Sequence, residues 1–382
     1  MLVLPPISIW ERKWICRPGG WYNHVNILIS ERRRRVDILE EIERANRLRW
    51  DSSRRGRYEV YYATFNHLAS CRGFWIRYTL NAPKNRNDSP YAQVWFSSFN
   101  HSEPARNFGL RRKYPIDSLR TDQDPFMLWL DGCEMSSGTL KGHIEDSEHE
   151  IRWDLSYTCA DPVHLHLPRF LYKYPIADTT VLCPAPDASF EGKIRLDGER
   201  IVFDGDPGCQ THIWGKKHAH RWAWGHCNAF ENSPDTVFEG LSVQVRRAGV
   251  ALPALNFLYF RHAGREYRFT ELPSSLHTRS EFETGRWTFS AQSGDTLISG
   301  QISCAYGDII RADYTDPDGE PSYCHNTETA RAEITISTRN GKLGRWEQSE
   351  TLVSPCAAHV EFASRTKDPR VEKKILDAPL PK

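Results

Sequence analysis

The sequence predicts an all-β protein made of two similar domains in tandem. From about residue 58 to about residue 362, short stretches rich in Val, Ile, Trp, Tyr and Phe alternate with Gly, Pro, Asn and Asp turns. Helical periodicity is nearly absent from this part of the chain, and similar segments recur along it. Many short strands at this spacing are typical of a sandwich or a barrel.

An internal repeat supports the tandem arrangement. Segments 140–154 (LKGHIEDSEHEIRWD) and 190–204 (FEGKIRLDGERIVFD) carry Gly, Ile, Ile and Asp at matching positions, and 298–313 is a looser third copy. Each copy predicts a β-hairpin, since a polar turn separates two strand-like stretches. The first and third copies lie far apart in the chain, as two similar domains in tandem would place them.

Composition divides the chain further. In segment 31–50 (ERRRRVDILEEIERANRLRW), apolar residues recur every three positions among charged residues, which predicts one amphipathic helix. These residues are Val36, Leu39, Ile42, Ala45 and Leu48. The Pro-rich segment 174–189 predicts a junction between domains. The predicted parts are an N-terminal extension with one helix, partly flexible (1–57), a first β domain (58–180), a second β domain (188–365) and a C-terminal tail (366–382).

Charge and cysteine usage exclude several classes of function. The 382 residues carry a formal net charge of +1, so no overall field attracts nucleic acid or acidic membranes. No window reaches the run of about 20 apolar residues that a membrane span needs. The first 20 residues are interrupted by Pro and charge and do not resemble a signal peptide, which predicts a cytoplasmic protein. The ten cysteines form no C-x-x-C pair, and we expect reduced thiols.

Residues 212–230 (HIWGKKHAHRWAWGHCNAF) carry the strongest functional signal. From Trp222 onward, large or polar residues alternate with small ones, which predicts a β-strand with two unlike faces. The large face consists of Trp222, Trp224, His226, Asn228 and Phe230. Buried indole, imidazole and amide groups all need partners. We therefore expect this face to line a cavity for an apolar ligand with a few polar groups, the alternative being a well-packed barrel interior.

The same residues resemble the central signature of the tocopherol cyclase and carotenoid hydratase (hydroxyneurosporene synthase) superfamily. In that signature a W-G pair, here Trp214–Gly215, precedes W-x-W, a polar residue and N-x-F. Segments 73–80, 323–336 and 357–365 are similar to further strands of the superfamily. The resemblance implies two lipocalin-like (calycin) β-barrels packed against each other. It also implies cyclase, hydratase or cycloaddition chemistry on greasy substrates without a redox cofactor.

Cyclisation and hydration need a carboxylic acid kept protonated by burial, together with aromatic faces that attract a developing cation. Acids beside aromatic or apolar strand residues are Asp154, Asp204, Glu239 and Asp313, and Asp313 is favoured because Tyr314 and the cluster at 323–326 follow it. A pericyclic role needs only shape and one hydrogen bond. The predicted catalytic residues are His226, Asn228 and Asp313. The predicted substrate-binding residues are Trp75, Tyr78, Trp95, Trp214, Trp222, Trp224, Phe230, Tyr259, Tyr323 and His325.

Metal and nucleophilic chemistry find less support. His218 and His220 form an H-x-H pair, as do His164 and His166, but neither pair has a third ligand at a typical spacing. We expect exposed loop histidines, no metal and no cofactor. The G-x-S-x-G elbow, the phosphate loop and the dinucleotide motif are all absent from the sequence.

The predicted function is therefore a cofactor-independent cyclase, hydratase or isomerase, including a pericyclase, in natural-product metabolism. Its substrate would be a hydrophobic terpenoid, polyene or polyketide, with no nucleic-acid partner and an open oligomeric state. A non-catalytic carrier of a lipid-like molecule is the alternative, and a scaffold with a vestigial cavity is a weaker one. A buried acid with a raised pKa facing the cavity favours the enzyme over the carrier.

Overall fold

A computed structural model describes residues 36–174, 176–247, 250–341 and 343–380. Strands make up 61% of the structure and helices 9%, which confirms the all-β prediction. No helix within these residues is long and apolar enough to cross a membrane. Among the described residues, the short elements outside the two large sheets include α2 (Phe170–Lys173), α3 (Leu272–Ser275), four single 3-10 turns, and the small ladder of β15 (Arg246–Arg247) with β16 (Val250–Ala251).

The first sheet has 13 strands and contains most of the N-terminal half. In spatial order its strands are β25 (Leu376–Asp377), β4 (Phe108–Pro115), β3 (Tyr91–Asn100), β2 (Arg72–Ala82), β1 (Arg57–His67), β12 (Glu199–Gly215), β11 (Thr179–Leu196), β9 (Glu150–Cys159), β8 (Thr139–Glu145), β7 (Cys133–Ser136), β6 (Phe126–Leu130) and β5 (Leu119–Gln123), with β10 (His164–Leu165) on β11. All these pairs are antiparallel except β25 with β4.

The second sheet has ten strands. In spatial order they are β18 (Arg265–Phe269), β17 (Leu255–His262), β14 (Val237–Gln244), β13 (Arg221–Cys227), β24 (Glu347–Ser364), β23 (Pro321–Thr338), β21 (Thr296–Ser303), β20 (Arg286–Ser293) and β19 (Thr278–Glu283), with β22 (Ile310–Thr315) on β23. The hydroxyls of Ser242 on β14 and Ser280 on β19 are hydrogen-bonded at 2.6 Å. This side-chain contact joins the last strand, β19, to β14, the third strand from the other end of the sheet, and the barrel is nearly closed.

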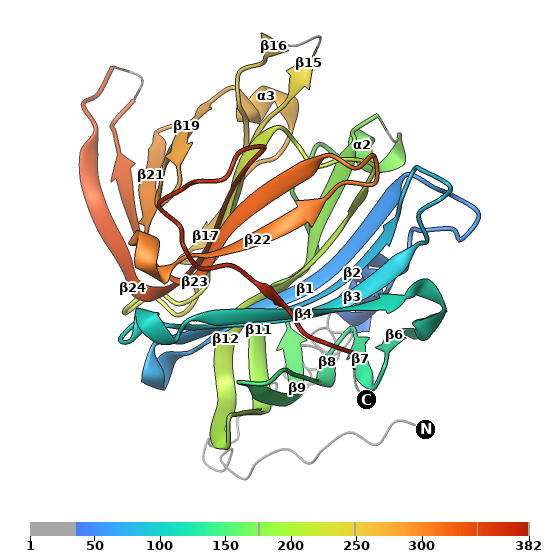
Figure 1. Cartoon of the computed structure of the whole chain (residues 1–382). Helices are drawn as coiled ribbons and strands as arrows, with labels where there is room; N and C mark the ends of the chain where they lie inside the picture. The colour runs from blue at the N-terminus through green and yellow to red at the C-terminus, as the bar shows by residue number, and fades with distance from the viewer. Residues whose placement is uncertain (1–35, 175, 248–249, 342, 381–382) are drawn as a thin grey trace, which may run out of the picture.

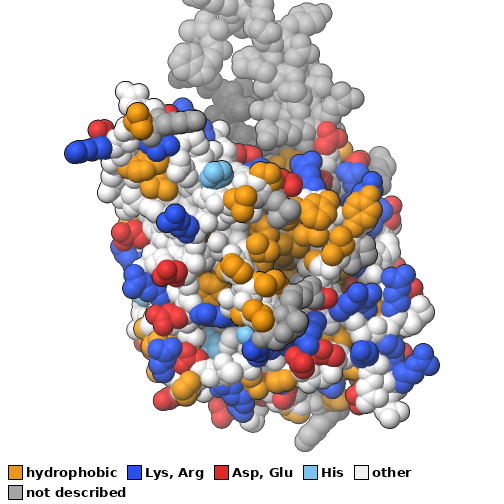
Figure 2. Space-filling model, turned by 90° about the horizontal axis from the view of Figure 1, so that it is seen from above, with side chains coloured by type: hydrophobic (Ala, Val, Ile, Leu, Met, Phe, Trp, Pro, Cys, Tyr) orange, Lys and Arg blue, Asp and Glu red, His pale blue; other side chains and the backbone are white. Residues whose placement is uncertain are grey.

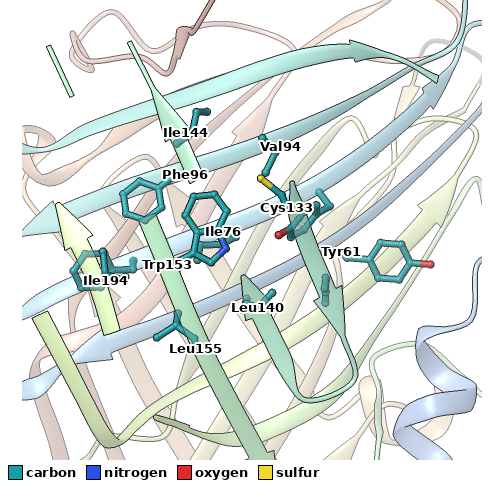
Figure 3. Packing of buried hydrophobic residues seen from close by; sticks show 14 of the residues in the cluster. Tyr61, Ile76, Val94, Phe96, Cys133, Leu140, Ile144, Trp153, Leu155 and Ile194 are labelled. Atoms are coloured by element: carbon teal, nitrogen blue, oxygen red, sulfur yellow. The ribbon is translucent and has the colours of Figure 1, made fainter. Parts of the chain in front are cut away.

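Each barrel has its own apolar core, and a third cluster lies between the sheets. Figure 3 shows the first core, where Phe96 stacks on Trp153 with ring centroids 5.8 Å apart. Ile76, Ile144 and Ile194 are fully buried in this core.

The sheets face each other, with the strands coloured blue to cyan lying below those coloured orange in Figure 1. At the closest approach a Cβ on Gly73 of β2 would lie 2.4 Å from Glu328 Cβ of β23, so only glycine fits there. Strands β1 and β13 are buried along almost their whole length, because one face of each packs into its own barrel and the other into the space between the sheets.

The sheets change along the chain between β12 and β13. The predicted junction at 174–189 instead falls at the start of β11, which hydrogen-bonds to β12 and β9 of the first sheet. Of the three repeats, 140–154 and 190–204 form the hairpins β8–β9 and β11–β12, as predicted. The prediction of a hairpin at 298–313 is wrong, because β21 and β22 both pair with β23 and not with each other.

The two ends of the described chain pack on the first sheet. Residues 36–46 form a helix, and Ile38, Ile42 and Ala45 are its buried apolar residues. Of the residues predicted for the apolar face, Ile42 and Ala45 are buried but Val36 and Leu39 are exposed, so the three-residue spacing was right for only part of the face, and the i, i+4, i+7 spacing is the correct pattern. The expected flexible part, residues 1–35, lies outside the described residues. The predicted C-terminal tail instead returns to the first sheet as β25.

Candidate functional site

A cavity of about 710 Å³ lies between the two sheets. Seen from above, Figure 2 shows hydrophobic side chains gathered around a hollow on this face of the molecule. The apolar and aromatic residues that line the cavity are Tyr62, Leu167, Leu171, Val181, Ile213, Trp222, Trp224, Leu241, Val243, Leu255, Phe257 and Tyr314. A pocket of this size and lining suits a small hydrophobic ligand.

Strand β13 supplies one wall of the cavity. The alternation predicted from the sequence holds from Trp222 to Cys227. The indoles of Trp222 and Trp224 face the space between the sheets, whereas Ala223 and Cys227 pack into the second barrel. The cavity is therefore between the barrels and not inside either one. The alternation ends with the strand, and Phe230 lies in the second core and not on the tryptophan face.

Glu361 on β24 is a buried carboxylic acid in the cavity wall. Glu361 is 6% exposed, and its Oε2 accepts a hydrogen bond from Trp222 Nε1 at 3.5 Å. Burial raises the pKa of Glu361 above its usual value, although the Arg77 charge and the hydrogen bonds from Trp222 and Cys324 oppose the shift. A proton can therefore stay on this carboxyl at a higher pH than in water.

Arg77 on β2 lies across the cavity from β24 and is 4% exposed. Its guanidinium donates to Tyr314 Oη at 2.6 Å and to Thr79 Oγ1 at 2.9 Å. The same group lies over the rings of Trp75, Trp95 and Tyr314, at 5.4, 5.3 and 4.3 Å from their centroids. These contacts hold a positive charge in the wall of a cavity whose lining is mainly apolar and aromatic but also includes Glu361, His218 and Arg365.

His218 closes the side of the cavity near Arg365. The ring stacks on Tyr58 at 4.4 Å and on Trp222 at 5.4 Å, and its Nδ1 lies 2.5 Å from Asp316 Oδ1. Burial lowers the pKa of His218 in spite of Asp316, so the ring is mostly neutral near pH 7. The expectation of exposed loop histidines is wrong here, since stacking and the Asp316 contact bury this ring. It is also wrong for His164 and His166, which are buried between the sheets.

The three predicted catalytic residues lie outside the cavity lining. His226 is fully buried, and its Nε2 lies 2.7 Å from the Pro186 carbonyl oxygen. Asn228 donates through Nδ2 to Asp187 Oδ1 at 2.8 Å and so ties β13 to the first sheet. Asp313 forms an ion pair with Arg311 at 2.6 Å and lines a smaller, more polar pocket of about 380 Å³.

The other predicted binding residues are spread over several environments. Trp75 and Trp95 belong to the cluster between the sheets, behind Arg77. Tyr78 lies in the first core and donates to the Glu134 carbonyl oxygen at 3.1 Å. Trp214 packs beside the N-terminal helix, because its strand turns this face away from the second sheet. For Tyr78 and Trp214, alternation along the strand shows which residues share a face. It does not show which of the two faces meets the cavity.

Three further predicted binding residues are also outside the cavity lining. Tyr259 is buried against His164, with ring centroids 4.9 Å apart. Tyr323 is half-buried beneath Lys367. His325 lines a shallow groove, where its Nε2 accepts a hydrogen bond from the Asp368 backbone N–H at 3.2 Å.

Of the other acid candidates, Glu239 is the one buried between the sheets. Its Oε1 accepts a hydrogen bond from Trp224 Nε1 at 2.7 Å and lies 2.6 Å from His166 Nε2. This hydrogen bond from Trp224 to Glu239 therefore fixes the orientation of an indole that lines the cavity. Asp154 and Asp204 are exposed on the outer surface of the first sheet.

Sequence reasoning missed Glu361 and Arg77. A signal for Glu361 was present in segment 357–365, where a lone acid alternates with apolar residues along a strand. Arg77 gave a comparable signal in GFWIRYTL, as one cation within an aromatic strand. Each is a charged residue at a strand position that the alternation of side chains predicts to be buried.

The fold and the cavity together define a double-barrel all-β protein with a ligand-sized pocket between its sheets. Residues 130–361 match the tocopherol cyclase-like family, and the chain belongs to this family.

Two Mycobacterium tuberculosis proteins, the uncharacterized proteins MT0513 (strain CDC 1551 / Oshkosh) and Rv0493c (strain ATCC 25618 / H37Rv), are 26% identical over 311 residues. The match covers 79% of this chain and 88% of each relative.

Among solved structures, a candidate AttH from Nitrosomonas europaea aligns with a TM-score of 0.49 at 13% identity, over 80% of this chain and 92% of that chain. Kievitone hydratase from Nectria haematococca aligns with a TM-score of 0.44 at 11% identity, over 84% and 91%. CghA aligns with a TM-score of 0.47 at 10% identity, over 82% and 90%.

Proposed function

We propose that this protein is a cofactor-independent cyclase or hydratase that protonates an alkene of a hydrophobic substrate between its two sheets. The observation that carries the proposal is Glu361, a buried acid with a raised pKa in the wall of an apolar cavity. Membership of the tocopherol cyclase-like family supports the same class of reaction. A carrier would need no such acid, because burial of an ionisable group costs free energy that only function or pairing offsets.

The proposed mechanism begins with the neutral Glu361 carboxyl. It transfers its proton to one alkene carbon and leaves a carbocation on the other. The indoles of Trp222 and Trp224 stabilise that cation by about 0.5–2 kcal/mol each. In a hydration, a water oxygen adds to the cationic carbon and the surplus proton returns to the Glu361 carboxylate. In a cyclisation, a hydroxyl of the substrate takes the place of water, and the proton balance is the same.

The two ends of the cavity suggest the class of substrate. Arg77 and the Tyr314 hydroxyl offer hydrogen bonds to one oxygen of the ligand, whereas Leu167, Leu171 and Phe257 contact only carbon chains. A molecule with a phenol, carbonyl or hydroxyl group and an unsaturated tail fits this pattern. Terpenoids, prenylated polyketides and polyenes share it.

Deuterium incorporation tests the proposal directly. The purified protein is incubated in D2O with a prenylated hydroquinone and, separately, with an acyclic polyene alcohol, and the products are analysed by mass spectrometry. We expect one deuterium on a carbon of the product, because the acid proton exchanges with solvent before transfer. Glu361→Gln should bind the probe and incorporate none, whereas Glu361→Asp should retain a reduced rate.

Two other outcomes decide between the alternatives. If Asp313→Asn abolishes incorporation and Glu361→Gln does not, the acid favoured by the sequence is the catalytic one. If the probe quenches tryptophan fluorescence and remains unchanged, the protein is a carrier. The exposed Asp204→Asn serves as a control for the removal of a carboxylate elsewhere.

A further inference from the structure

Three buried metal-ligand side chains meet behind the cavity, where the two sheets are joined. Cys209 belongs to β12 of the first sheet, and His226 and His359 lie directly opposite each other on β13 and β24 of the second. The sulfur and one nitrogen of each ring lie within 4.8 Å of one another, and all three residues are fully buried. None of the three lines the proposed catalytic cavity.

The hydrogen bonds around the two histidines fix their tautomers. His226 Nε2 lies 2.7 Å from the Pro186 carbonyl oxygen, which only accepts, so this nitrogen carries a hydrogen. His359 Nε2 lies 2.7 Å from Asn66 Oδ1. The amide of Asn66 is oriented by its Nδ2, which donates to the Glu328 carbonyl oxygen at 2.7 Å. Both Nε2 atoms are therefore protonated, and both neutral rings carry a lone pair on Nδ1.

The two Nδ1 atoms face each other at 3.1 Å. Two lone pairs at this distance repel unless a cation lies between them. Two imidazoles that bind one zinc ion in tetrahedral geometry place their nitrogens about 3.3 Å apart. An Nε2–H donated to a carbonyl oxygen is also the usual support of a histidine that binds metal through its other nitrogen.

A second group of buried potential ligands shares Cys209 and lies beside the first. Glu239 and Cys183 form another group with Cys209, whose ligand atoms also lie within 4.8 Å of one another. Glu239 Oε2 is buried and makes no hydrogen bond to any residue that the structure describes. A buried carboxylate oxygen without a donor is costly, and a nearby cation would offset that cost.

We propose that Cys209, His226 and His359 bind one zinc-type divalent ion, with the Cys209 thiolate and the two Nδ1 atoms as ligands. Thiolate and imidazole are the donors that zinc prefers. The ion links the first sheet to the second and has a structural role. It also fixes the cavity wall, because the ring of His226 is parallel to that of Trp224 at 6.5 Å. This site could not be predicted from the sequence, because its ligands come from three strands that are separate in the chain.

Metal analysis of the full chain tests the site without a substrate. The protein is produced with added zinc, dialysed against zinc-free buffer and measured by elemental mass spectrometry. We expect about one zinc per chain in the wild type, and less than about a fifth of that in Cys209→Ser and His359→Gln. Cys227→Ser is the matched control, because this buried thiol lies next to His226 but faces the second core. It should keep the full zinc content.

Cobalt substitution in the wild-type protein tests the same ligands without a variant, so the test still holds if a variant fails to fold. The wild type loaded with Co2+ should show a thiolate-to-metal charge-transfer band, and chelation of zinc should lower its Tm. Wild-type protein without zinc, with a Tm that neither zinc nor a chelator changes, would overturn the proposal. So would zinc bound with no thiolate band, or zinc retained in full by Cys209→Ser. None of these outcomes affects the Glu361 proposal, which is tested by deuterium incorporation.

Discussion

Glu328 should make the protein less stable as the pH rises from mildly acidic to alkaline. This residue lies on β23 at the closest approach of the sheets and is 1% exposed. Asn326 Nδ2 donates to its Oε1 at 2.9 Å, and Thr64 Oγ1 contacts its Oε2. Burial outweighs these hydrogen bonds and raises the pKa of Glu328 from 4.5 to about 8.

The sign of the effect follows from proton linkage. Below about pH 4.5 the carboxyl is protonated in both the folded and the unfolded chain. The contribution of Glu328 to the free energy of unfolding is then fully present. Between that pH and the pKa of about 8, the unfolded chain releases a proton that the folded chain keeps. The free energy of unfolding therefore falls by about 1.4 kcal/mol per pH unit, or roughly 5 kcal/mol across the window.

Urea unfolding followed by tryptophan fluorescence, in steps from about pH 5 to about pH 8.5, measures this slope. Glu328→Gln mimics the neutral acid, because its amide can bond to the same neighbours, and should remove most of the decline. Glu333→Gln, an exposed residue on the same strand, should leave the slope unchanged. Equal slopes in the wild type and in Glu328→Gln would refute the reasoning.

Three further predictions concern packing and the acid. Gly73→Ala should lower the free energy of unfolding by about 1–3 kcal/mol, because its Cβ would lie 2.6 Å from the Glu328 carbonyl oxygen; unchanged urea curves would contradict this. Gly142→Ala, whose Cβ would lie 2.4 Å from an indole carbon of the first core, should be similarly destabilised and yet retain wild-type ligand affinity at low temperature. Trp222→Phe removes a hydrogen bond to Glu361, so the alkaline limb of the pH–rate profile should move to higher pH; a shift to lower pH would argue against the acid.

The sequence by itself determined the fold class, two of the three hairpins and the two faces of β13. These features depend on local periodicity, because a strand places successive side chains on opposite faces whatever lies around it. The same periodicity marked Trp222 and Trp224 as unusual for a core. Val36 and Leu39 show the limit of a local pattern, since a spacing of three fits a helix less well than the 3.6-residue turn.

Only the tertiary structure decided where the cavity lies and which acid faces it. Alternation cannot tell a face that packs into its own barrel from one that packs against a second sheet, so Tyr78 and Trp214 were grouped with the tryptophans of the cavity. Burial of Glu361 depends on the packing of the two sheets, and its distance from Arg77 in the chain hides their proximity. Desolvation is a property of the assembled sheets, which is why Glu361 and Arg77, unlike Trp222 and Trp224, were recognised as site residues only in three dimensions.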